Sequence, residues 1–355
     1  MKLEDLGYNS ITEELRSIRN LNSFDIGRVI AEHKERYLIG TSVGEVEAEI
    51  TGNIRFAAKS REDFPAVGDW VAITYYGEGY AVINEILPRF SIIKRQAVAH
   101  FGEVQIIATN IDYAFLIQSV DRDFNVNRLE RYLTICYSSK VNPIIVLTKT
   151  DLINEQQLNE MSEELKQRVK DVPVFAISNK NRDGYKKLSE TIQKGKTYCM
   201  LGSSGVGKST LLNNLSGKSI MKTDEISQHT NKGRHISSHR ILTILENGGI
   251  LIDNPGMREV GIPDSISGLE TTFDKIINLS KNCKFKNCSH KNETGCAIIE
   301  ALKRGEIEQN FYDNYLKLER EEAHFSSTTA EKHKKNKEFG KMIKNYKKDM
   351  KRNQY

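Results

Sequence analysis

The stretch from Gly202 to Thr210 constrains the chain more than any other, because it matches the phosphate-binding loop pattern G-x-x-x-x-G-K-[ST] at every fixed position. Residues 196–201 before it predict a strand and residues 211–215 after it predict a helix, which is the context this loop requires. Its backbone N–H groups and the helix N-terminus would face phosphate oxygens. The predicted phosphate-binding residues are Gly202, Ser203, Ser204, Gly205, Val206, Gly207, Lys208, Ser209 and Thr210.

Individual side chains of the predicted site have separate roles. Lys208 would reach the β- and γ-phosphates, and the Ser209 hydroxyl would bind Mg²⁺, a hard cation that needs only one or two protein oxygens. Asp253 follows a later apolar strand, about fifty residues after the loop, and can orient the same Mg²⁺. The N–H of Gly256 can meet a γ-phosphate oxygen.

Two further polar segments follow apolar strand candidates. The segment Thr148-Lys149-Thr150-Asp151 comes after one strand, and the segment Ser178-Asn179-Lys180 comes after the next. Ligands of α/β sheets bind at the ends of strands, so we expect both segments at the nucleotide. Asp151 can accept hydrogen bonds from the guanine N1–H and exocyclic amine, which adenine lacks at those positions. The sequence therefore predicts a guanine nucleotide and opposes an ATPase.

Short alternating apolar runs upstream, punctuated by glycines and Pro65, predict a small closed barrel of the OB type over residues 24–95. Such barrels often bind nucleic acid through basic and aromatic side chains. The candidates here are Arg36, Tyr37, Arg55, Phe56, Arg61, Tyr75 and Tyr76. The alternative is that the aromatic side chains pack inside the barrel and the arginines are ordinary surface charges.

Three cysteines and one histidine crowd into fourteen residues. They are Cys283, Cys288, His290 and Cys296. Three thiolates and one imidazole close a tetrahedral zinc shell with no open position, so we expect one structural zinc rather than a chance cluster. The other two of the five cysteines, Cys136 and Cys199, lie singly in apolar segments and are expected to be buried small hydrophobic residues.

The end of the chain is strongly basic. Residues 331–355 carry ten Lys or Arg against three Asp or Glu, within a chain of net charge +5. Such a tail is either a nucleic-acid-binding arm or a solvated end that keeps the protein soluble. No apolar run approaches the roughly 20 residues that cross a membrane, and the N-terminus lacks a signal region. We expect a cytoplasmic monomer with no membrane partner.

The order of the motifs identifies a family. In an ordinary small GTPase the phosphate loop precedes the base-recognition motif, whereas here residues 148–151 precede residues 202–210, so the GTPase domain is circularly permuted. With a barrel in front and a Cys/His cluster behind, the chain closely resembles the bacterial RsgA family (YjeQ, YloQ) of small-ribosomal-subunit-dependent GTPases. The resemblance spans residues 24–300, and its supporting stretches are 65–71, 110–112, 205–209, 233–235 and 255–259.

This resemblance implies a circularly permuted α/β P-loop GTPase domain with an N-terminal OB-type barrel and a C-terminal zinc-binding helical module. It implies a GTP hydrolase that acts in late maturation of the small ribosomal subunit, binds GTP, GDP and ribosomal RNA, and is stimulated by the subunit. The basic tail then favours contact with RNA or subunit proteins. The expected parts are an N-terminal extension, the barrel, the GTPase domain, the zinc-binding module and the basic tail, over residues 1–23, 24–95, 96–262, 263–330 and 331–355.

Several positions depart from the pattern expected of the family. Thr148 stands where Asn is usual; it lacks the amide, so base affinity is expected to be weaker while Asp151 keeps the selection. Asn254 replaces a usual Thr or Ser with little mechanistic consequence. In the first switch Ile236 replaces a threonine and cannot coordinate metal, so Ser237 is the expected Mg²⁺ ligand.

The water-positioning glutamine of Ras-like proteins is replaced by Met257, whose thioether cannot do that work. We therefore expect slow intrinsic hydrolysis. His235 is the catalytic candidate, because an imidazole can orient the attacking water or accept its proton; the alternative is a surface or RNA-contacting histidine. A scaffold that holds nucleotide and RNA with negligible turnover is the second functional hypothesis.

Overall fold

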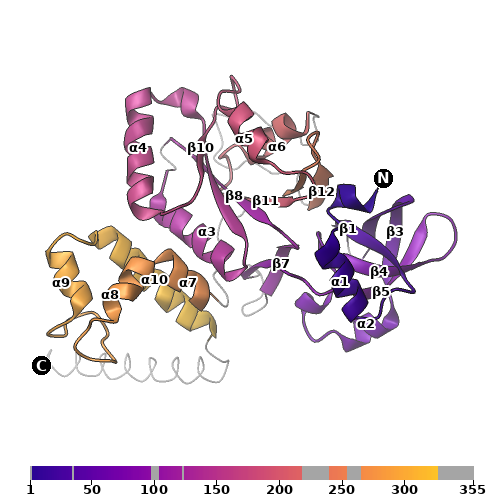
Figure 1. The fold of residues 1–355 in the computed structure, drawn as a ribbon, viewed down its shortest axis with the longest axis horizontal. Helices are drawn as coiled ribbons and strands as arrows, with labels where there is room; N and C mark the ends of the chain where they lie inside the picture. Colours follow the sequence, from indigo (N-terminus) through magenta and orange to yellow (C-terminus); the bar gives the residue numbers. More distant parts are fainter. Residues whose placement is uncertain are drawn as a thin grey trace, which may run out of the picture.

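Three parts follow one another along the chain in the computed structural model, with a barrel on the right of Figure 1, a sheet with helices in the centre and a helical module at the lower left. The structure describes residues 2–33, 36–96, 104–121, 124–217, 240–253 and 265–326. In this part of the chain, no helix combines the length and the apolar character that a bilayer-spanning segment needs.

The N-terminal barrel is built from five short strands. They are β1 (Asp25–His33), β2 (Arg36–Thr41), β3 (Gly44–Ile50), β4 (Trp70–Tyr75) and β5 (Tyr80–Ile86). The strands pair in the order β1-β2-β3-β5-β4, and a further β1–β4 pairing closes the barrel. Side chains alternate between core and solvent, as β3 shows, because successive residues of a strand point to opposite faces. The predicted barrel is confirmed.

Short helices decorate the barrel. They are η1 (Leu3–Leu6), α1 (Ser10–Ile18), α2 (Gly52–Ala57) and η2 (Arg61–Asp63). Among the aromatic candidates for nucleic-acid contact, Phe56 on α2 is 94% exposed, whereas Tyr37 on β2 is 2% exposed. For Tyr37 the alternative therefore holds, in which the ring packs inside the barrel, since its strand position places it in the barrel core.

The central sheet has the order β10-β9-β8-β11-β13-β12. Its strands are β8 (Tyr113–Ser119), β9 (Asn142–Thr148), β10 (Val174–Ala176), β11 (Thr197–Gly202), β12 (Ile241–Ile244) and β13 (Ile250–Asp253). All neighbours pair in parallel except β12, which forms an antiparallel hairpin with β13. The strands are almost continuously apolar because both faces of the sheet are covered.

Helices cover the two faces of this sheet. They are α3 (Val126–Ser138), α4 (Glu155–Arg168), α5 (Tyr185–Thr191) and α6 (Lys208–Ser216), with η3 (Thr150–Leu152) after β9. Along β8, Leu116 joins the core with α3 and α4, and Phe115 and Ile117 join the core with α5 and α6. Cys136 and Cys199 are fully buried, as predicted.

Two features join the barrel to the central sheet. The strands β6 (Ile92–Gln96) and β7 (Val104–Thr109) form a separate antiparallel pair between the two parts. In addition, Ala31 of β1 pairs with Ile241 of β12, so that the barrel and the central sheet form one continuous ladder of strands.

A fully buried arginine lies at the same junction. Arg28 on β1 is 1% exposed, and its guanidinium donates to the carbonyls of Leu6, Gly68 and Asn110 at 2.6, 3.1 and 3.1 Å. It also donates to the Thr197 hydroxyl at 2.9 Å, at the first residue of β11. Burial lowers the Arg28 pKa to about 10, yet the side chain stays cationic at neutral pH. One cation therefore holds the N-terminal segment, the barrel, β7 and β11 together.

The C-terminal module packs against α3. It contains α7 (Ile266–Thr272), α8 (Asp274–Ser280), α9 (Ala297–Lys303) and α10 (Gln309–Ser326). The buried Glu130 of α3 accepts hydrogen bonds from Arg168 of α4 at 2.8 Å and from Asn314 of α10 at 2.5 Å. Arg131 and Glu321 form a bidentate pair beside them, at 2.5 and 2.6 Å. These charged contacts fix the module to the helices α3 and α4 that cover the central sheet.

We expect Arg28→Ala to lower the free energy of unfolding by about 3 kcal/mol or more, because it leaves several buried acceptors without a donor. Arg28→Lys should recover little of this loss, since one ammonium cannot span four separate acceptors. Chemical denaturation monitored by fluorescence measures the change. The control Arg36→Ala removes a side chain that is 71% exposed and should cost less than about 0.5 kcal/mol. Equal stabilities of the Arg28→Ala and Arg36→Ala proteins would contradict the assigned role.

Candidate nucleotide-binding site and metal centre

The phosphate loop connects the end of β11 to the start of α6. Gly205 and Gly207 have φ angles of +82° and +92°, in the left-handed region where glycine costs least. Gly202 is close-packed, because a Cβ there would lie 2.5 Å from the Ile117 carbonyl oxygen of β8. The loop therefore has the strand, turn and helix that the sequence predicts, with the N-terminus of α6 at its end.

Lys208 is 8% exposed, and its ammonium donates to the carbonyls of Gly202 and Ser203 at 2.8 and 2.5 Å. Burial lowers the Lys208 pKa to about 8, and the carboxylate of Asp253 opposes the shift. Asp253 is itself buried at the end of β13, the strand beside β11, and Ser209 is half-buried in the first turn of α6. A cation, a carboxylate and a hydroxyl thus gather where a phosphate with its hard metal ion would need them.

The base-recognition segment lies directly against the phosphate loop. The Thr148 hydroxyl at the end of β9 donates to the Val206 carbonyl at 2.6 Å. The Ser178 hydroxyl, which follows β10, donates to Asp151 Oδ1 at 2.6 Å. Lys149 has a φ of +61° and its ammonium lies 2.8 Å from Asp121. The circularly permuted order therefore still brings the two predicted halves of the site into contact.

Every described residue of the predicted nucleotide site lies at the carboxyl-terminal edge of the central sheet. These residues are Thr148, Lys149, Thr150, Asp151, Ser178, Gly202, Ser203, Ser204, Gly205, Val206, Gly207, Lys208, Ser209, Thr210 and Asp253. The remaining predicted residues, His235, Ser237 and Gly256, lie outside the described residues, as do Ile236, Asn254 and Met257.

Sequence reasoning missed two residues of this edge, Tyr185 and Asn214. Asn179, which belongs to the predicted polar segment 178–180, donates to the Gly207 carbonyl at 3.1 Å, and Tyr185 and Asn214 hold Asn179 in turn. The parts played by Tyr185 and Asn214 depend on how α5 and α6 pack and have no signal in the sequence.

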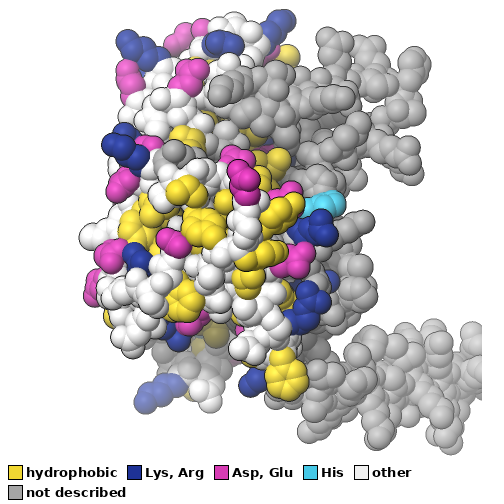
Figure 2. Space-filling view, turned by 90° about the vertical axis from the view of Figure 1, so that its right-hand side faces the viewer, with side chains coloured by type: hydrophobic (Ala, Val, Ile, Leu, Met, Phe, Trp, Pro, Cys, Tyr) yellow, Lys and Arg dark blue, Asp and Glu magenta, His cyan; other side chains and the backbone are white. Residues whose placement is uncertain are grey.

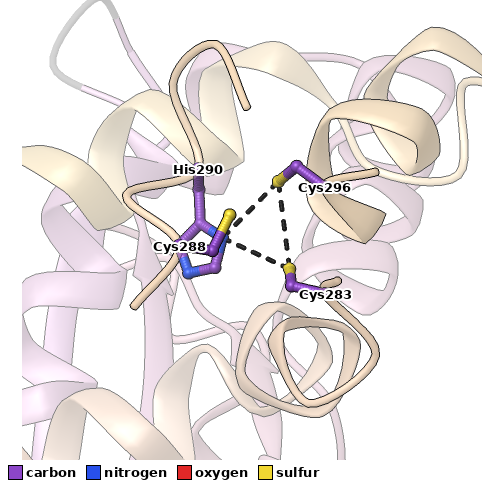
Figure 3. A group of neighbouring side chains, drawn as sticks. All are labelled: Cys283, Cys288, His290 and Cys296. Carbon is purple, nitrogen blue, oxygen red and sulfur yellow. Dashed lines mark hydrogen bonds between the residues drawn. The ribbon is translucent and has the colours of Figure 1, made fainter. Parts of the chain in front are cut away.

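Cys283, Cys288, His290 and Cys296 converge in the C-terminal module, as Figure 3 shows. Their potential ligand atoms all lie within 4.8 Å of one another. The Sγ atoms of Cys283 and Cys296 are 3.9 Å apart, and each is 3.5 Å from His290 Nδ1. Four soft or borderline donors at this spacing could hold one metal ion.

The surrounding groups hold the cluster in place. His290 has a φ of +60°, and its carbonyl accepts a hydrogen bond from the Tyr312 hydroxyl of α10 at 2.7 Å. Glu293 accepts from the Ser289 hydroxyl and from the backbone N–H groups of Ser289, Lys291 and Asn292. These bonds, led by that of the Ser289 hydroxyl, lower the Glu293 pKa to about 2. The loop between the ligands is therefore fixed by hydrogen bonds of its own.

Comparison with known families gives two matches. A family model described as RsgA GTPase matches residues 86–263, and a model described as ABC transporter matches residues 185–354. Both contain the phosphate loop, which is found in many classes of nucleotide-binding protein. The second leaves out residues 148–151 and therefore does not account for the base-recognition segment.

Curated relatives are similar over nearly their whole length. A protein of Listeria innocua is 41% identical over 91% of this chain and 90% of its own, and one of Bacteroides thetaiotaomicron is 37% identical over 94% and 93%. Both carry the name small ribosomal subunit biogenesis GTPase RsgA 1. A solved structure titled YloQ, a circularly permuted GTPase, is 25% identical over 86% of this chain and 97% of its own, with a TM-score of 0.60.

The buried ammonium of Lys208 predicts a pH dependence of nucleotide binding. The free protein has a Lys208 pKa of about 8, and a bound phosphate would raise it, so binding favours the protonated form. The affinity for GDP should be greatest below about pH 8 and fall above it, by up to about tenfold per pH unit. Dissociation constants of a fluorescent GDP between about pH 7 and pH 9 measure this slope.

Lys208→Arg is the matched control, because a guanidinium stays charged over this range. Whatever its absolute affinity, its slope should be flatter, and any pH dependence it keeps belongs to the nucleotide or to other groups. Identical slopes for both proteins would contradict the role given to the Lys208 ammonium.

Proposed function

The chain belongs to the RsgA family of GTPases, and from this we propose that it hydrolyses GTP in the biogenesis of the small ribosomal subunit. The observation that carries the proposal is the hydrogen bond from Thr148 to Val206, which joins a base-recognition segment to a phosphate loop that follows it in the sequence. The names of relatives at 37–41% identity supply the small subunit as the partner.

In the proposed site, residues 202–210 bind the phosphates, Lys208 neutralises their charge, and Ser209 with Asp253 holds Mg²⁺. The segment 148–151 and Ser178 bind guanine. Ser178 supports this assignment because its hydrogen bond orients the Asp151 carboxylate, and Asp151 must present two acceptor sites to the base. Gly256 and Ser237 belong to the same proposal as a γ-phosphate contact and a second Mg²⁺ ligand.

The proposed chemistry is attack of water on the γ-phosphate. Because phosphoryl transfer depends on positioning and charge stabilisation, the chain needs a group that orients the water, and Met257 cannot be that group. We assign this part to His235, with subunit binding needed to bring it into place. Slow hydrolysis by the free protein follows from this assignment.

The barrel supplies a surface suited to ribosomal RNA. Figure 2 looks onto the barrel side, where hydrophobic side chains are interspersed with both basic and acidic ones. Phe56 is 94% exposed, and Tyr76 and Tyr80, each 49% exposed, form an aromatic pair with ring centroids 6.1 Å apart. Exposed rings stack on unpaired bases, and exposed cations of the barrel such as Arg61 neutralise phosphates. The basic tail, residues 331–355, is assigned to the same partner.

The proposal also covers the oligomeric state, the division into domains and the location in the cell. A monomer is part of the same proposal. We propose that the chain divides into an N-terminal extension, a barrel, a GTPase domain, a zinc-binding module and a basic tail. These parts span residues 1–23, 24–95, 96–262, 263–330 and 331–355. A protein that works on assembling small subunits acts where they are assembled, which is the cytoplasm in bacteria such as those of its named relatives.

We propose zinc as the metal of the Cys283 cluster. A tetrahedral shell with Zn–S of about 2.3 Å and Zn–N of about 2.0 Å separates its ligand atoms by roughly 3.5–3.8 Å. The separations among Cys283 Sγ, Cys296 Sγ and His290 Nδ1, 3.5 and 3.9 Å, are close to these values, and Cys288 Sγ lies within 4.8 Å of the other three atoms. Four protein ligands leave no open position, so the zinc would be structural.

His235→Ala should lower the subunit-stimulated rate of GTP hydrolysis by roughly 100-fold, because it removes the group that orients or deprotonates the water. Its affinity for GDP should be unchanged. Phosphate release measured with and without purified small subunits tests the rate, and titration with a fluorescent GDP tests the affinity. Competition by ATP tests the choice of base. Stimulated turnover that survives in the His235→Ala protein would exclude this histidine. A wild-type protein that the subunit does not stimulate would instead favour the scaffold hypothesis.

Cys288→Ser should lose the one bound zinc per chain and with it much of the thermal stability of the C-terminal module, since structural zinc contributes folding free energy directly. Metal analysis by mass spectrometry and thermal unfolding with and without chelator measure the two effects. Cys136→Ala removes a buried thiol that is not one of the four grouped ligands and should retain the metal. Full zinc content in the Cys288→Ser protein would refute the ligand assignment.

A further inference from the structure

Asn179 occupies a position between the base-recognition and phosphate-binding parts of the site. It lies in the loop after β10, separated from that strand by Ile177 and Ser178, and is half-buried. Its side-chain Nδ2 donates to the Gly207 carbonyl at 3.1 Å, and its Oδ1 accepts from the Tyr185 hydroxyl at 2.5 Å. Both polar atoms of the amide are therefore engaged, one of them on the phosphate loop.

The direction of these hydrogen bonds is fixed by a third side chain. Asn214 of α6 donates through Nδ2 to the Tyr185 oxygen at 3.0 Å, so the phenol must use its own proton on Asn179. Burial raises the Tyr185 pKa to about 12, which keeps that proton in place. Because Asn179 Oδ1 must accept, its NH₂ group must face Gly207. The chain Asn214, Tyr185, Asn179, Gly207 therefore has one orientation.

The contacted carbonyl lies at a sensitive point of the loop. Gly207 has the left-handed φ of +92°, directly precedes Lys208, and its carbonyl also accepts the N–H of Leu211 in the first turn of α6. A Cβ on Gly207 would lie 2.4 Å from Asn179 Nδ2, so the amide fills the space beside the glycine. Asn179 thus holds the carbonyl from which α6 begins.

A second side chain holds the neighbouring carbonyl. Thr148 donates to Val206, one residue before Gly207, from the end of β9. A hydroxyl has a single proton, so Thr148 can serve one acceptor strongly, whereas an amide has two. Thr148, at the end of β9, and Asn179, in the loop after β10, therefore each hold one carbonyl of the phosphate loop.

We infer that Asn179 is a positioning residue of the nucleotide site: it fixes the end of the phosphate loop and the start of α6 to the base-recognition edge, so that the loop N–H groups are oriented for phosphate. This rests on the proposed function in that the ligand is a guanine nucleotide. Asn179 therefore contributes to the affinity for the phosphates, whereas the selection of guanine depends on Asp151.

The experiment compares the affinities of purified full-length variants for GDP and for IDP, which lacks the exocyclic amine of guanine. Asn179→Ala should weaken GDP binding about tenfold, the usual range for one lost hydrogen bond at a preorganised site, while the GDP-to-IDP ratio stays that of the wild type. Asn179→Asp should bind more weakly still, because a carboxylate has no proton for the Gly207 carbonyl. Tyr185→Phe, which frees the amide to turn, should fall between wild type and Asn179→Ala.

Two further variants separate positioning from general stability. Asn181→Ala changes a neighbouring exposed side chain that bonds only to Asp183 among the described contacts of its amide, and should bind GDP like the wild type. Thr148→Asn introduced into Asn179→Ala places an amide with two donors near both carbonyls, since Thr148 Oγ1 is 4.0 Å from the site of a Gly207 Cβ. This double variant should recover a substantial part of the lost GDP affinity.

Unchanged GDP affinity in Asn179→Ala would overturn the inference. A change in the GDP-to-IDP ratio would also overturn it, as would a lowered melting temperature of the nucleotide-free protein with no rescue by Thr148→Asn. If the wild-type protein binds no GDP, the proposed function fails and this inference with it. Normal wild-type binding with an unaffected Asn179→Ala protein removes the inference alone.

Discussion

A parallel sheet brings the carboxyl ends of all its strands to one edge, and the whole nucleotide site depends on this constraint. The strands β9, β10, β11 and β13 each end in a polar segment, and the four segments meet although they lie far apart in the sequence. The order in which the chain visits the strands does not enter this geometry. A circular permutation therefore leaves the site intact as long as the strand order and the loop that follows each strand are preserved.

Residue patterns alone predicted most of this arrangement. The phosphate loop, the parallel sheet, the five-strand barrel and the convergence of Cys283, Cys288, His290 and Cys296 each have a local signature in spacing or periodicity. The buried contacts that join these parts have none. The sequence around Arg28 resembles that of any arginine on a strand, although in the structure four acceptors from distant segments surround the side chain. For Tyr37 the sequence leaves open whether the ring faces solvent or the barrel core, because the strand register is not known from the sequence.

The metal cluster and the GTPase domain are joined through α10. The Tyr312 hydroxyl holds the carbonyl of the ligand His290, and two positions later in the same helix Asn314 binds the buried Glu130 of α3. Glu130 also accepts from Arg168 at the end of α4. One helix, α10, therefore contacts both the loop that carries His290 and the buried Glu130, through which α3 and α4 are joined. A buried carboxylate with two donors makes this connection specific in position as well as tight.

The pairing of Ala31 with Ile241 connects the barrel to the central sheet. β12 lies between the barrel strand β1 and β13, and β13 ends in Asp253 beside the ammonium of Lys208. β12 also follows, in the sequence, the stretch that contains His235. β12 thus connects the barrel strand β1 to the strand that ends in Asp253. The barrel and the edge that carries the nucleotide site therefore share one hydrogen-bonded sheet, so the orientation of the barrel and the position of Asp253 are linked through a single intervening strand.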